Sequence, residues 1–244
     1  MRRRISVAMA TYNGEKYIEE QLKSILCQLS CTDEIIISDD GSKDHTIEII
    51  KKMDDDRIKL LRGPGKGVKK NFENALKKCT GQYVFLSDQD DVWIDNKVDI
   101  VLNTFANNPK CTCVLHDCSV FDERCDKVLN PSFYMFRNTR VGILKNLIKN
   151  SYIGCCMAFD SSLIKYIIPI PNEIEMHDQW IGMLSEIYGE NIMITDKLIK
   201  YRRHLENVSD MKHHPLMIMI KNRIFLVKNL ISTVHRIYKE KKDG

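Results

Sequence analysis

The regular alternation of strand-like and helix-like segments in the first hundred residues most strongly constrains the fold of this chain. Runs rich in β-branched and other apolar residues predict four strands, at residues 5–9, 34–38, 57–61 and 83–86. Apolar residues at helical spacing predict helices between them, within residues 15–29, 46–50 and 68–79. Strands that alternate with helices of this length indicate βαβ units, so we expect an α/β fold with a mainly parallel sheet.

A polar turn follows each of these strands. The turns contain Thr11-Tyr12-Asn13-Gly14, Asp39-Asp40-Gly41-Ser42, Gly63-Pro64-Gly65-Lys66-Gly67 and Ser87-Asp88-Gln89-Asp90-Asp91. In parallel sheets, ligands bind beyond the carboxyl ends of the strands, where an aromatic ring can stack on a base and a carboxylate can accept from a ribose hydroxyl. Taken singly, Asn13-Gly14 and Asp40-Gly41 are also ordinary turn dipeptides, and Asp39 also suits a helix cap.

The last of these turns is strongly acidic. Asp88, Asp90 and Asp91 place three carboxylates within four residues. Like charges at this spacing repel one another, which favours a bound cation. Clustered oxygen ligands suit Mg²⁺ or Mn²⁺, and proteins typically hold Mg²⁺ through one or two carboxylates together with substrate phosphates. The alternative is an acidic turn whose side chains cap the next helix.

Two common nucleotide-binding motifs are absent from the sequence. No GxGxxG follows the first strand, which argues against a dinucleotide-binding Rossmann enzyme. The glycine loop at 63–67 lacks the GxxxxGK[ST] spacing of a P-loop, so we interpret it as a flexible turn near the ligand.

The second half of the chain is less regular. Apolar runs predict short strands at 113–116, 154–159, 192–194 and 198–201. A helix is expected at 178–188, and residues 215–238 form a helical pattern in which Leu216, Ile220, Ile224, Val227 and Ile231 alternate with Lys and Arg.

Composition excludes several classes of protein. With 43% hydrophobic and 29% charged residues and a net charge of +4, the chain is globular and lacks the strongly basic face of a nucleic-acid binder. The nine cysteines show no zinc-binding spacing, and we interpret them as small core residues of a reduced protein. We expect a cytoplasmic protein, because Arg2-Arg3-Arg4 is followed by a short strand rather than a signal peptide, and no apolar run of about 18 residues follows.

Four of the motifs occur in an order and at spacings that resemble glycosyltransferase family 2. They are Thr11-Tyr12-Asn13-Gly14, Ser38-Asp39-Asp40-Gly41-Ser42, Asn71-Phe72-Glu73-Asn74-Ala75 and Ser87-Asp88-Gln89-Asp90-Asp91. The resemblance covers about residues 4–205 and implies the GT-A fold, a Rossmann-like mixed, mainly parallel sheet flanked by helices, with further C-terminal helices. It also implies a divalent metal and inverting sugar transfer. The Asp-Gln-Asp-Asp-x-Trp form is similar to the bacterial, rhamnosyltransferase-like branch that makes O-antigen, capsule and other surface polysaccharides.

The resemblance also implies a division of the chain. A GT-A domain is expected over residues 1–210, with a nucleotide-binding half at 1–110 and an acceptor-binding half at 111–210. Residues 211–244 would form a separate basic, amphipathic helical segment.

By motif, the resemblance assigns the nucleotide to the first two turns. Tyr12 and Asp40 match contacts to the base, with Asp39 close by, and Thr11 and Asn13 belong to the same donor-binding turn. In the acidic run, Asp90 and Asp91 match the family's metal-binding motif.

The doubled aspartate leaves the metal ligand ambiguous. We favour Asp91 as the direct ligand, with Asp90 in contact with ribose or a metal-bound water. Asp88 is placed at the donor site; the alternative is that it only buttresses the loop.

Two downstream motifs complete the implied site. Asp178, at a loop-to-helix junction, matches the family's catalytic base, which takes the proton of the acceptor hydroxyl; alternatively it caps the helix. Trp180 suits the core or an acceptor platform. His204 is assigned to the metal or diphosphate, and Arg202 and Arg203 beside it suit a diphosphate.

The expected partners follow from this resemblance. They are a UDP- or dTDP-sugar, Mn²⁺ or Mg²⁺, and a lipid-linked saccharide acceptor, with no nucleic acid. The basic C-terminal helices could pack on the domain, pair two subunits as a homodimer, or lie on the inner face of the cell membrane. Two rival functions remain: a sugar-phosphate nucleotidyltransferase, which would normally show a Gly-rich basic signature after the first strand, and an inactive nucleotide-binding scaffold, which would not need Asp91 and Asp178.

Overall fold

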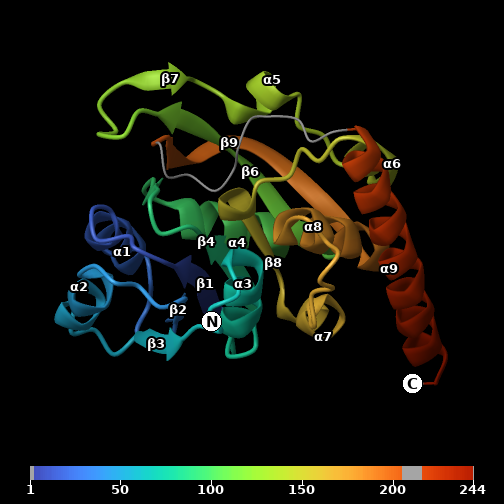
Figure 1. The fold of residues 1–244 in the computed structure, drawn as a ribbon, viewed down its shortest axis with the longest axis horizontal. Coiled ribbons are helices and arrows are strands. Elements are labelled where there is room, and N and C mark those ends of the chain that lie inside the picture. Colours follow the sequence, from blue (N-terminus) through green and yellow to red (C-terminus); the bar gives the residue numbers. More distant parts are fainter. Residues whose placement is uncertain (1–2, 205–215, 244) are drawn as a thin grey trace.

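The computed structural model describes residues 3–204 and 216–243 of the chain. Nine strands and nine α-helices alternate along this part of the chain in an α/β arrangement (Figure 1). The strands are β1 (Ile5–Thr11), β2 (Glu34–Asp39), β3 (Ile58–Arg62), β4 (Tyr83–Ser87), β5 (Val92–Trp93), β6 (Cys111–Phe121), β7 (Val128–Asn130), β8 (Met157–Asp160) and β9 (Glu190–Arg202). The helices are α1 (Ile18–Leu26), α2 (Thr46–Lys52), α3 (Val68–Leu76), α4 (Lys97–Asn107), α5 (Phe133–Arg137), α6 (Ile143–Ile148), α7 (Ile164–Ile167), α8 (His177–Tyr188) and α9 (Leu216–Asp243).

The strands form one mixed sheet in the order β3-β2-β1-β4-β8-β6-β9-β5, with β7 paired to the outer part of β6. The first four strands are parallel, as the sequence predicts. The short strand β8 lies between β4 and β6 and is antiparallel to both. Strand β6 runs parallel to β9 along most of its length. The carboxyl ends of β1, β2 and β4 therefore lie at one edge of the sheet, where the polar turns meet.

Helices cover both faces of the sheet, because both faces of its central strands are apolar. Ile5, Val7 and Met9 of β1 pack into the core under α1, α2 and α4. Ala8 points to the opposite face, where α3, α7 and α8 supply the core. Such strands read as continuous apolar runs, which is typical of parallel strands buried on both sides.

Two expectations for the second half need correction. The strands expected at 192–194 and 198–201 are one continuous strand, β9. Its pairing with β6 shifts register at several points along the two strands. The strand expected at 154–159 begins as a 3-10 turn, η1 (Gly154–Cys156), and becomes extended only at Met157. A second 3-10 turn, η2 (Ser161–Leu163), leads into α7.

The C-terminal segment contains a single described helix, α9, rather than several helices. It packs on the domain through Leu226, Leu230 and Ile237, which are buried. Ile220 and Ile224, which belong to the apolar pattern in the sequence, are exposed. The expected boundary between residues 210 and 211 lies outside the described residues.

None of the helices in the described part of the chain combines the length and apolarity that a membrane crossing requires. All nine cysteines fall within the described ranges and all are free thiols, as the interpretation of a reduced protein expects.

Candidate active site

The carboxylate of Asp39 joins the ends of β1 and β2. Its Oδ1 accepts hydrogen bonds from the backbone N–H groups of Gly41 (3.1 Å) and Ser42 (2.8 Å). Its Oδ2 accepts from the hydroxyl groups of Ser42 (2.5 Å) and Thr11 (2.9 Å). Both Asp39 and Thr11 are buried. These two residues, which the sequence assigns to the donor, are therefore used to shape the loop that would contact it.

We expect Asp39→Ala to destabilise the protein more than Asp40→Ala does. The first change leaves buried donors without their acceptor, at a cost of roughly 2–3 kcal/mol in the free energy of unfolding. Urea unfolding followed by circular dichroism measures the difference. Equal stability of the two variants would show that the hydrogen bonds of Asp39 do not hold the loop.

Asp40 organises the glycine loop after β3. Its two carboxylate oxygens accept from the backbone N–H groups of Gly65 (2.6 Å) and Gly67 (2.8 Å). Both glycines have positive φ, +66° and +81°, which side chains other than glycine rarely adopt. The loop expected to be a flexible turn is thus held against the end of β2, beside the turn that carries Tyr12.

Tyr12 projects outward and is clamped through its backbone. Its side chain is 52% exposed, whereas its N–H donates to Gln89 Oε1 (2.9 Å) and its carbonyl accepts from Gln89 Nε2 (3.0 Å). The clamp needs Gly14, because a Cβ there would lie 2.4 Å from Gln89 Oε1. Asn13 fixes the other side of the turn. Its N–H donates to the hydroxyl of Ser42, and its side-chain oxygen accepts from the N–H of Lys43. The first turn and the acidic loop are therefore one unit that displays an exposed aromatic ring.

Arg202, at the end of β9, holds the acidic loop from behind. Its backbone N–H donates to Asp91 Oδ1 (3.0 Å) and its Nε donates to the carbonyl of Asp90 (2.7 Å). Its terminal nitrogens donate to the carbonyl of Glu123 (2.5 Å) and to Glu20 Oε2 (2.6 Å), and its guanidinium lies over the ring of Tyr17. Arg202 is buried, so its charge stabilises the loop rather than facing a ligand.

The carboxylate of Asp90 faces the imidazole of His204. Asp90 Oδ2 lies 2.7 Å from His204 Nε2, and the His204 ring stacks on Tyr17 with centroids 4.8 Å apart. The adjacent residue Arg203 is anchored by its N–H to the carbonyl of Phe121 (2.9 Å). Two residues 114 positions apart in sequence thus place an oxygen and a nitrogen donor side by side at the acidic loop.

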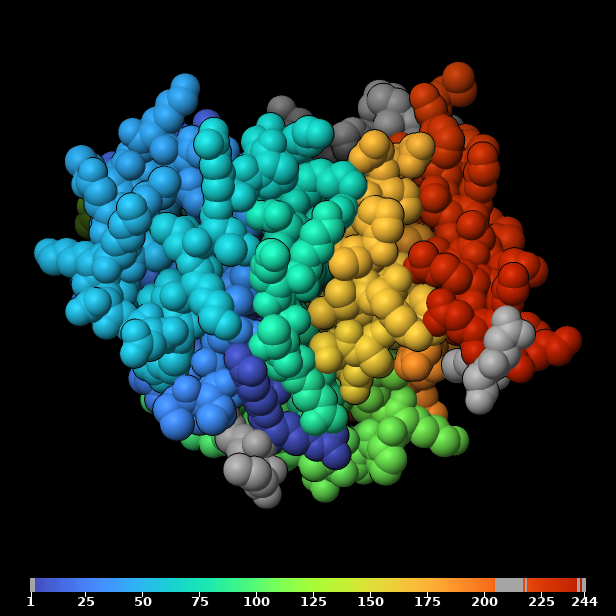
Figure 2. All heavy atoms as spheres, turned by 90° about the horizontal axis from the view of Figure 1, so that it is seen from below, coloured from blue at the N-terminus to red at the C-terminus, as the bar shows by residue number. Residues whose placement is uncertain are grey.

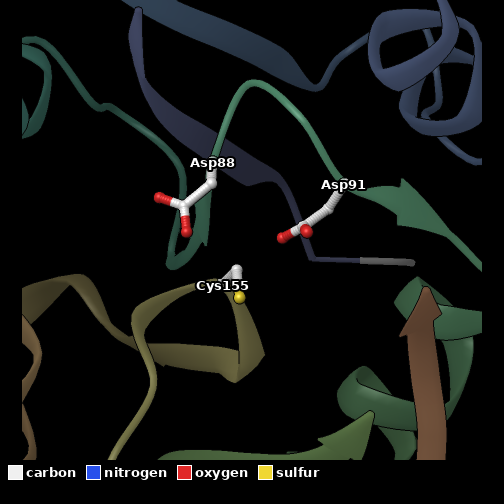
Figure 3. A group of neighbouring side chains, drawn as sticks. All are labelled: Asp88, Asp91 and Cys155. Carbon is white, nitrogen blue, oxygen red and sulfur yellow. The ribbon is translucent and has the colours of Figure 1, made fainter. Parts of the chain in front are cut away.

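A second group of donor atoms lies deeper. It consists of one carboxylate oxygen of Asp88, one of Asp91 and the sulfur of Cys155. These three atoms lie within 4.8 Å of one another (Figure 3). Burial, reinforced by Asp90, raises the pKa of Asp91 well above its usual range, and burial raises the pKa of Asp88 to about 7. Burial also raises the pKa of the Cys155 thiol, so the sulfur carries its proton. Asp91 Oδ2 has no hydrogen-bond partner within the described residues.

The two groups differ in burial and in donor atoms. Asp91 and Cys155 are fully buried, and a thiol sulfur is a softer ligand than the oxygen atoms that Mg²⁺ and Mn²⁺ prefer. The Asp90–His204 pair offers one carboxylate oxygen and one imidazole nitrogen that already face each other. Imidazole is typical of transition-metal sites, which favours Mn²⁺ over Mg²⁺ at this pair.

Asp178 lies in the first turn of α8, next to the acidic loop. It is 7% exposed, and its Oδ1 accepts from the N–H of Gln179 (2.5 Å) and from Asn150 Nδ2 (3.3 Å). Burial raises its pKa to about 6. Asp178 Cβ lies 3.8 Å from the place that a Cβ on Gly154 would take, and the next residue, Cys155, belongs to the group with Asp88 and Asp91.

The start of α8 shows that Asp178 does not act as its cap. The helix begins at His177, and the N-cap position is Met176. His177 is buried against Phe72, with ring centroids 4.1 Å apart, and burial lowers its pKa to about 4, so the ring is neutral. Trp180 is a core residue, since it is 1% exposed and its Nε1 donates to the carbonyl of Ile167.

Hydrogen bonds thus join the predicted residues of four segments, namely the turns after β1, β2 and β4 and the end of β9, and the fifth segment, with Asp178, lies beside Gly154. Sequence reasoning missed three residues that hold the predicted ones in place. Gln89 holds Tyr12, Asn150 holds Asp178, and Tyr17 stacks on His204. Gln89 could have been suspected from its position inside the acidic run. The partner of Asp178 gave no signal, because Asn150 lies 28 residues away in an irregular segment.

Comparison with protein families adds independent information on the chain. Residues 6–168 match the family described as Glycosyl transferase family 2. The chain is 27% identical over 216 residues to the UDP-Glc:alpha-D-GlcNAc-diphosphoundecaprenol beta-1,3-glucosyltransferase WfgD of Escherichia coli, with 87% of this chain and 82% of WfgD covered. It is 39% identical over 112 residues to the dTDP-rhamnosyl transferase RfbG of Shigella flexneri, with 42% and 39% covered.

Among solved structures, the fold is similar to S. aureus TarS 1-349 in complex with UDP-GlcNAc. The TM-score is 0.72 at 20% sequence identity, with 93% of this chain and 66% of the TarS chain covered. The chain therefore spans less than two thirds of RfbG and of the TarS chain. At this identity the likeness shows the fold alone.

Proposed function

The chain belongs to glycosyltransferase family 2 and is a glycosyltransferase of GT-A fold, and from that premise we propose an inverting, metal-dependent transfer of a sugar from a nucleotide-diphosphate donor to a saccharide hydroxyl. The observation that carries this proposal is the pairing of Asp90 with His204 on the acidic loop, which Gln89 ties to the turn that displays Tyr12. Asp178, whose pKa is raised to about 6, lies beside Gly154, the neighbour of Cys155 in the Asp88–Asp91–Cys155 group.

Each part of the donor has a counterpart in the site. The exposed ring of Tyr12 offers a stacking surface for the base, and the loop that Asp39 and Asp40 order lies beside it. Asp90 and His204 would hold Mn²⁺ or Mg²⁺, with Arg203 rather than the buried Arg202 near the diphosphate. When bound, the metal would supply positive charge to the leaving diphosphate.

Asp178 would act on the acceptor. As the acceptor hydroxyl attacks the anomeric carbon, its proton passes to a carboxylate oxygen of Asp178. Asn150 holds the other carboxylate oxygen and so orients the base. The acceptor oxygen forms its bond to the anomeric carbon as the bond to the nucleoside diphosphate breaks on the opposite face, so the anomeric configuration is inverted.

The wider setting is also part of the proposal. WfgD is described as acting with UDP-Glc on a diphosphoundecaprenol-linked acceptor, and RfbG is described as a dTDP-rhamnosyl transferase. We propose a UDP- or dTDP-sugar, a lipid-linked saccharide acceptor, and a role in bacterial surface polysaccharide synthesis at the inner face of the cell membrane.

Titration calorimetry with UDP, dTDP and GDP tests the donor site. We expect UDP or dTDP to bind in the presence of Mn²⁺ and to lose most of its affinity in EDTA. Product stereochemistry, followed by NMR at the anomeric proton, tests inversion. No binding of any of the three nucleotides, with or without metal, would contradict the proposed function.

The pKa of Asp178 predicts the acidic side of the pH–rate profile. A base must be deprotonated to work, so kcat/KM should fall about tenfold per pH unit below a midpoint near pH 6. In Asn150→Ala the midpoint should move to higher pH, because the hydrogen bond from Asn150 favours the charged carboxylate. A profile whose acidic midpoint is the same in both proteins would remove Asn150 from the proposed role.

A further inference from the structure

Large apolar side chains are exposed in only part of the described surface. Apart from Tyr12, all of them lie in residues 128–148 or in α9. On α6, Leu144 and Ile148 are 75% and 76% exposed, and on α9, Ile224 and Ile231 are 62% and 65% exposed. Isolated exposed apolar side chains are normal, but a group confined to neighbouring elements indicates a contact surface.

Helices α6 and α9 lie next to each other. Arg223 Nη2 donates to the carbonyl of Ile148 (3.3 Å) at the end of α6. Leu147 of α6 and Val227 and Val234 of α9 line an apolar groove between them. In the space-filling view, α9 forms one lateral edge of the molecule, with one flank against the preceding segments (Figure 2). We call the exposed residues Leu144, Ile148, Met217, Ile220, Ile224 and Ile231 the α6–α9 surface.

Helix α9 carries two apolar faces. Leu226, Leu230 and Ile237 are buried against the domain, whereas Ile224 and Ile231, seven residues apart, lie on the outward side. A helix that only packed on the domain would need the first face alone. The outward stripe is therefore not explained by the fold.

Positive charge predominates around this surface. The sequence contains no Asp or Glu from residue 127 to 159 or from 216 to 239. Exposed lysines occur in both segments, namely Lys145, Lys149, Lys221, Lys228 and Lys239. Carboxylates reach it only from other segments of the described chain: Glu175 accepts from Asn222 of α9 (3.0 Å) and Glu186 accepts from the N–H of Gly142 (2.7 Å). Apolar side chains flanked by an excess of lysines complement a surface of anionic lipid headgroups above hydrocarbon.

We propose that the α6–α9 surface docks the enzyme onto an anionic lipid bilayer, with α9 lying in the interface; this choice of occupant rests on the proposed lipid-linked acceptor. Helix α9 is about 42 Å long at roughly 1.5 Å per residue and would cover a long strip of headgroups. A second copy of the chain fits less well, because a symmetric pairing would bring the lysines of both copies together.

Hydrogen bonds also link the proposed docking surface to the proposed base. Asn146 and Asn150, at the end of α6 and just beyond it, are bonded to the start of α8. The carbonyl of Asn146 accepts from Gln179 Nε2 (2.7 Å), and Asn150 donates to Asp178. The surface that would meet the bilayer is thus two hydrogen bonds from the carboxylate that would act on the acceptor.

Vesicle co-sedimentation tests the surface without any enzymatic assay. The full chain should bind vesicles of phosphatidylcholine mixed with phosphatidylglycerol, and should bind pure phosphatidylcholine much more weakly. Two double variants remove apolar side chains from the surface, and each should weaken binding by about 10-fold. They are Leu144→Ser/Ile148→Ser on α6 and Ile224→Ser/Ile231→Ser on α9. Lys221→Glu/Lys228→Glu should weaken binding to the anionic vesicles by about 10-fold or more.

The matched control is Val128→Ser/Leu129→Ser on β7. These residues are exposed to a similar degree, 49% and 52%, but lie outside the α6–α9 surface, so binding should be unchanged. Nucleotide binding by calorimetry, measured on every variant, separates this test from that of the proposed function and shows that each variant is folded. The proposal is overturned by wild-type protein that does not sediment with anionic vesicles, by variants that bind as wild type, or by a dimer in solution that the same substitutions dissociate.

Discussion

Asp178→Asn is expected to lower kcat by about 10³-fold while the protein remains folded and binds its nucleotide, because general bases typically contribute 10²- to 10⁴-fold. The amide keeps the shape of the carboxyl group but cannot take the proton of the acceptor. The change should also stabilise the fold at neutral pH. Burial raises the pKa of Asp178 to about 6, so ionisation of this group costs stability as the pH rises through that value, and the amide removes that cost.

The gain in stability distinguishes this result from simple unfolding. We expect the free energy of unfolding at pH 7 to rise by about 1–2 kcal/mol, since one pKa unit corresponds to 1.36 kcal/mol and the hydrogen bonds of the carboxylate are partly lost. Asp99→Asn, at an exposed position of α4, is the matched control and should change neither rate nor stability. Transfer at the wild-type rate in Asp178→Asn would exclude this residue as the base.

Asp90→Asn is expected to weaken Mn²⁺-dependent nucleotide binding by about 100-fold or more, because even changes to residues that only orient a metal's ligands cost about 10- to 100-fold. Asp91→Asn should bind nearly as wild type, since Asp91 is fully buried and an amide oxygen can still accept from the N–H of Arg202. Calorimetry of UDP or dTDP with Mn²⁺ compares the two variants. The reverse outcome would assign the metal to Asp91 and His204 to another role.

The elements that local pattern determines could be predicted from the sequence. Strands β1 to β4 and the turns that follow them were expected within a few residues, because β-branched runs and turn dipeptides act over short distances. The family and the GT-A fold were also expected from four ordered motifs, and both are confirmed.

What depends on distant contacts could not be predicted. The sequence offers Asp90 and Asp91 as equivalent neighbours, yet Arg202, 111 residues further on, turns one of them inward. The same residue was expected to face a diphosphate, and its burial against Tyr17 follows only from the path of β9. The sequence also left open which face of α9 is buried. The helix has two apolar faces, and periodicity alone does not say which one meets the domain.

The long strand β9 has a consequence for how the enzyme is made. Helix α1, β4 and the acidic loop leave the ribosome early, but the groups that hold this loop, Arg202 and His204, follow more than a hundred residues later. During translation the carboxylates of the loop therefore remain without their basic partners until β9 inserts between β6 and β5. Insertion of this one strand completes the acidic loop, so a nascent chain halted before residue 202 would carry the nucleotide turns without a finished donor site.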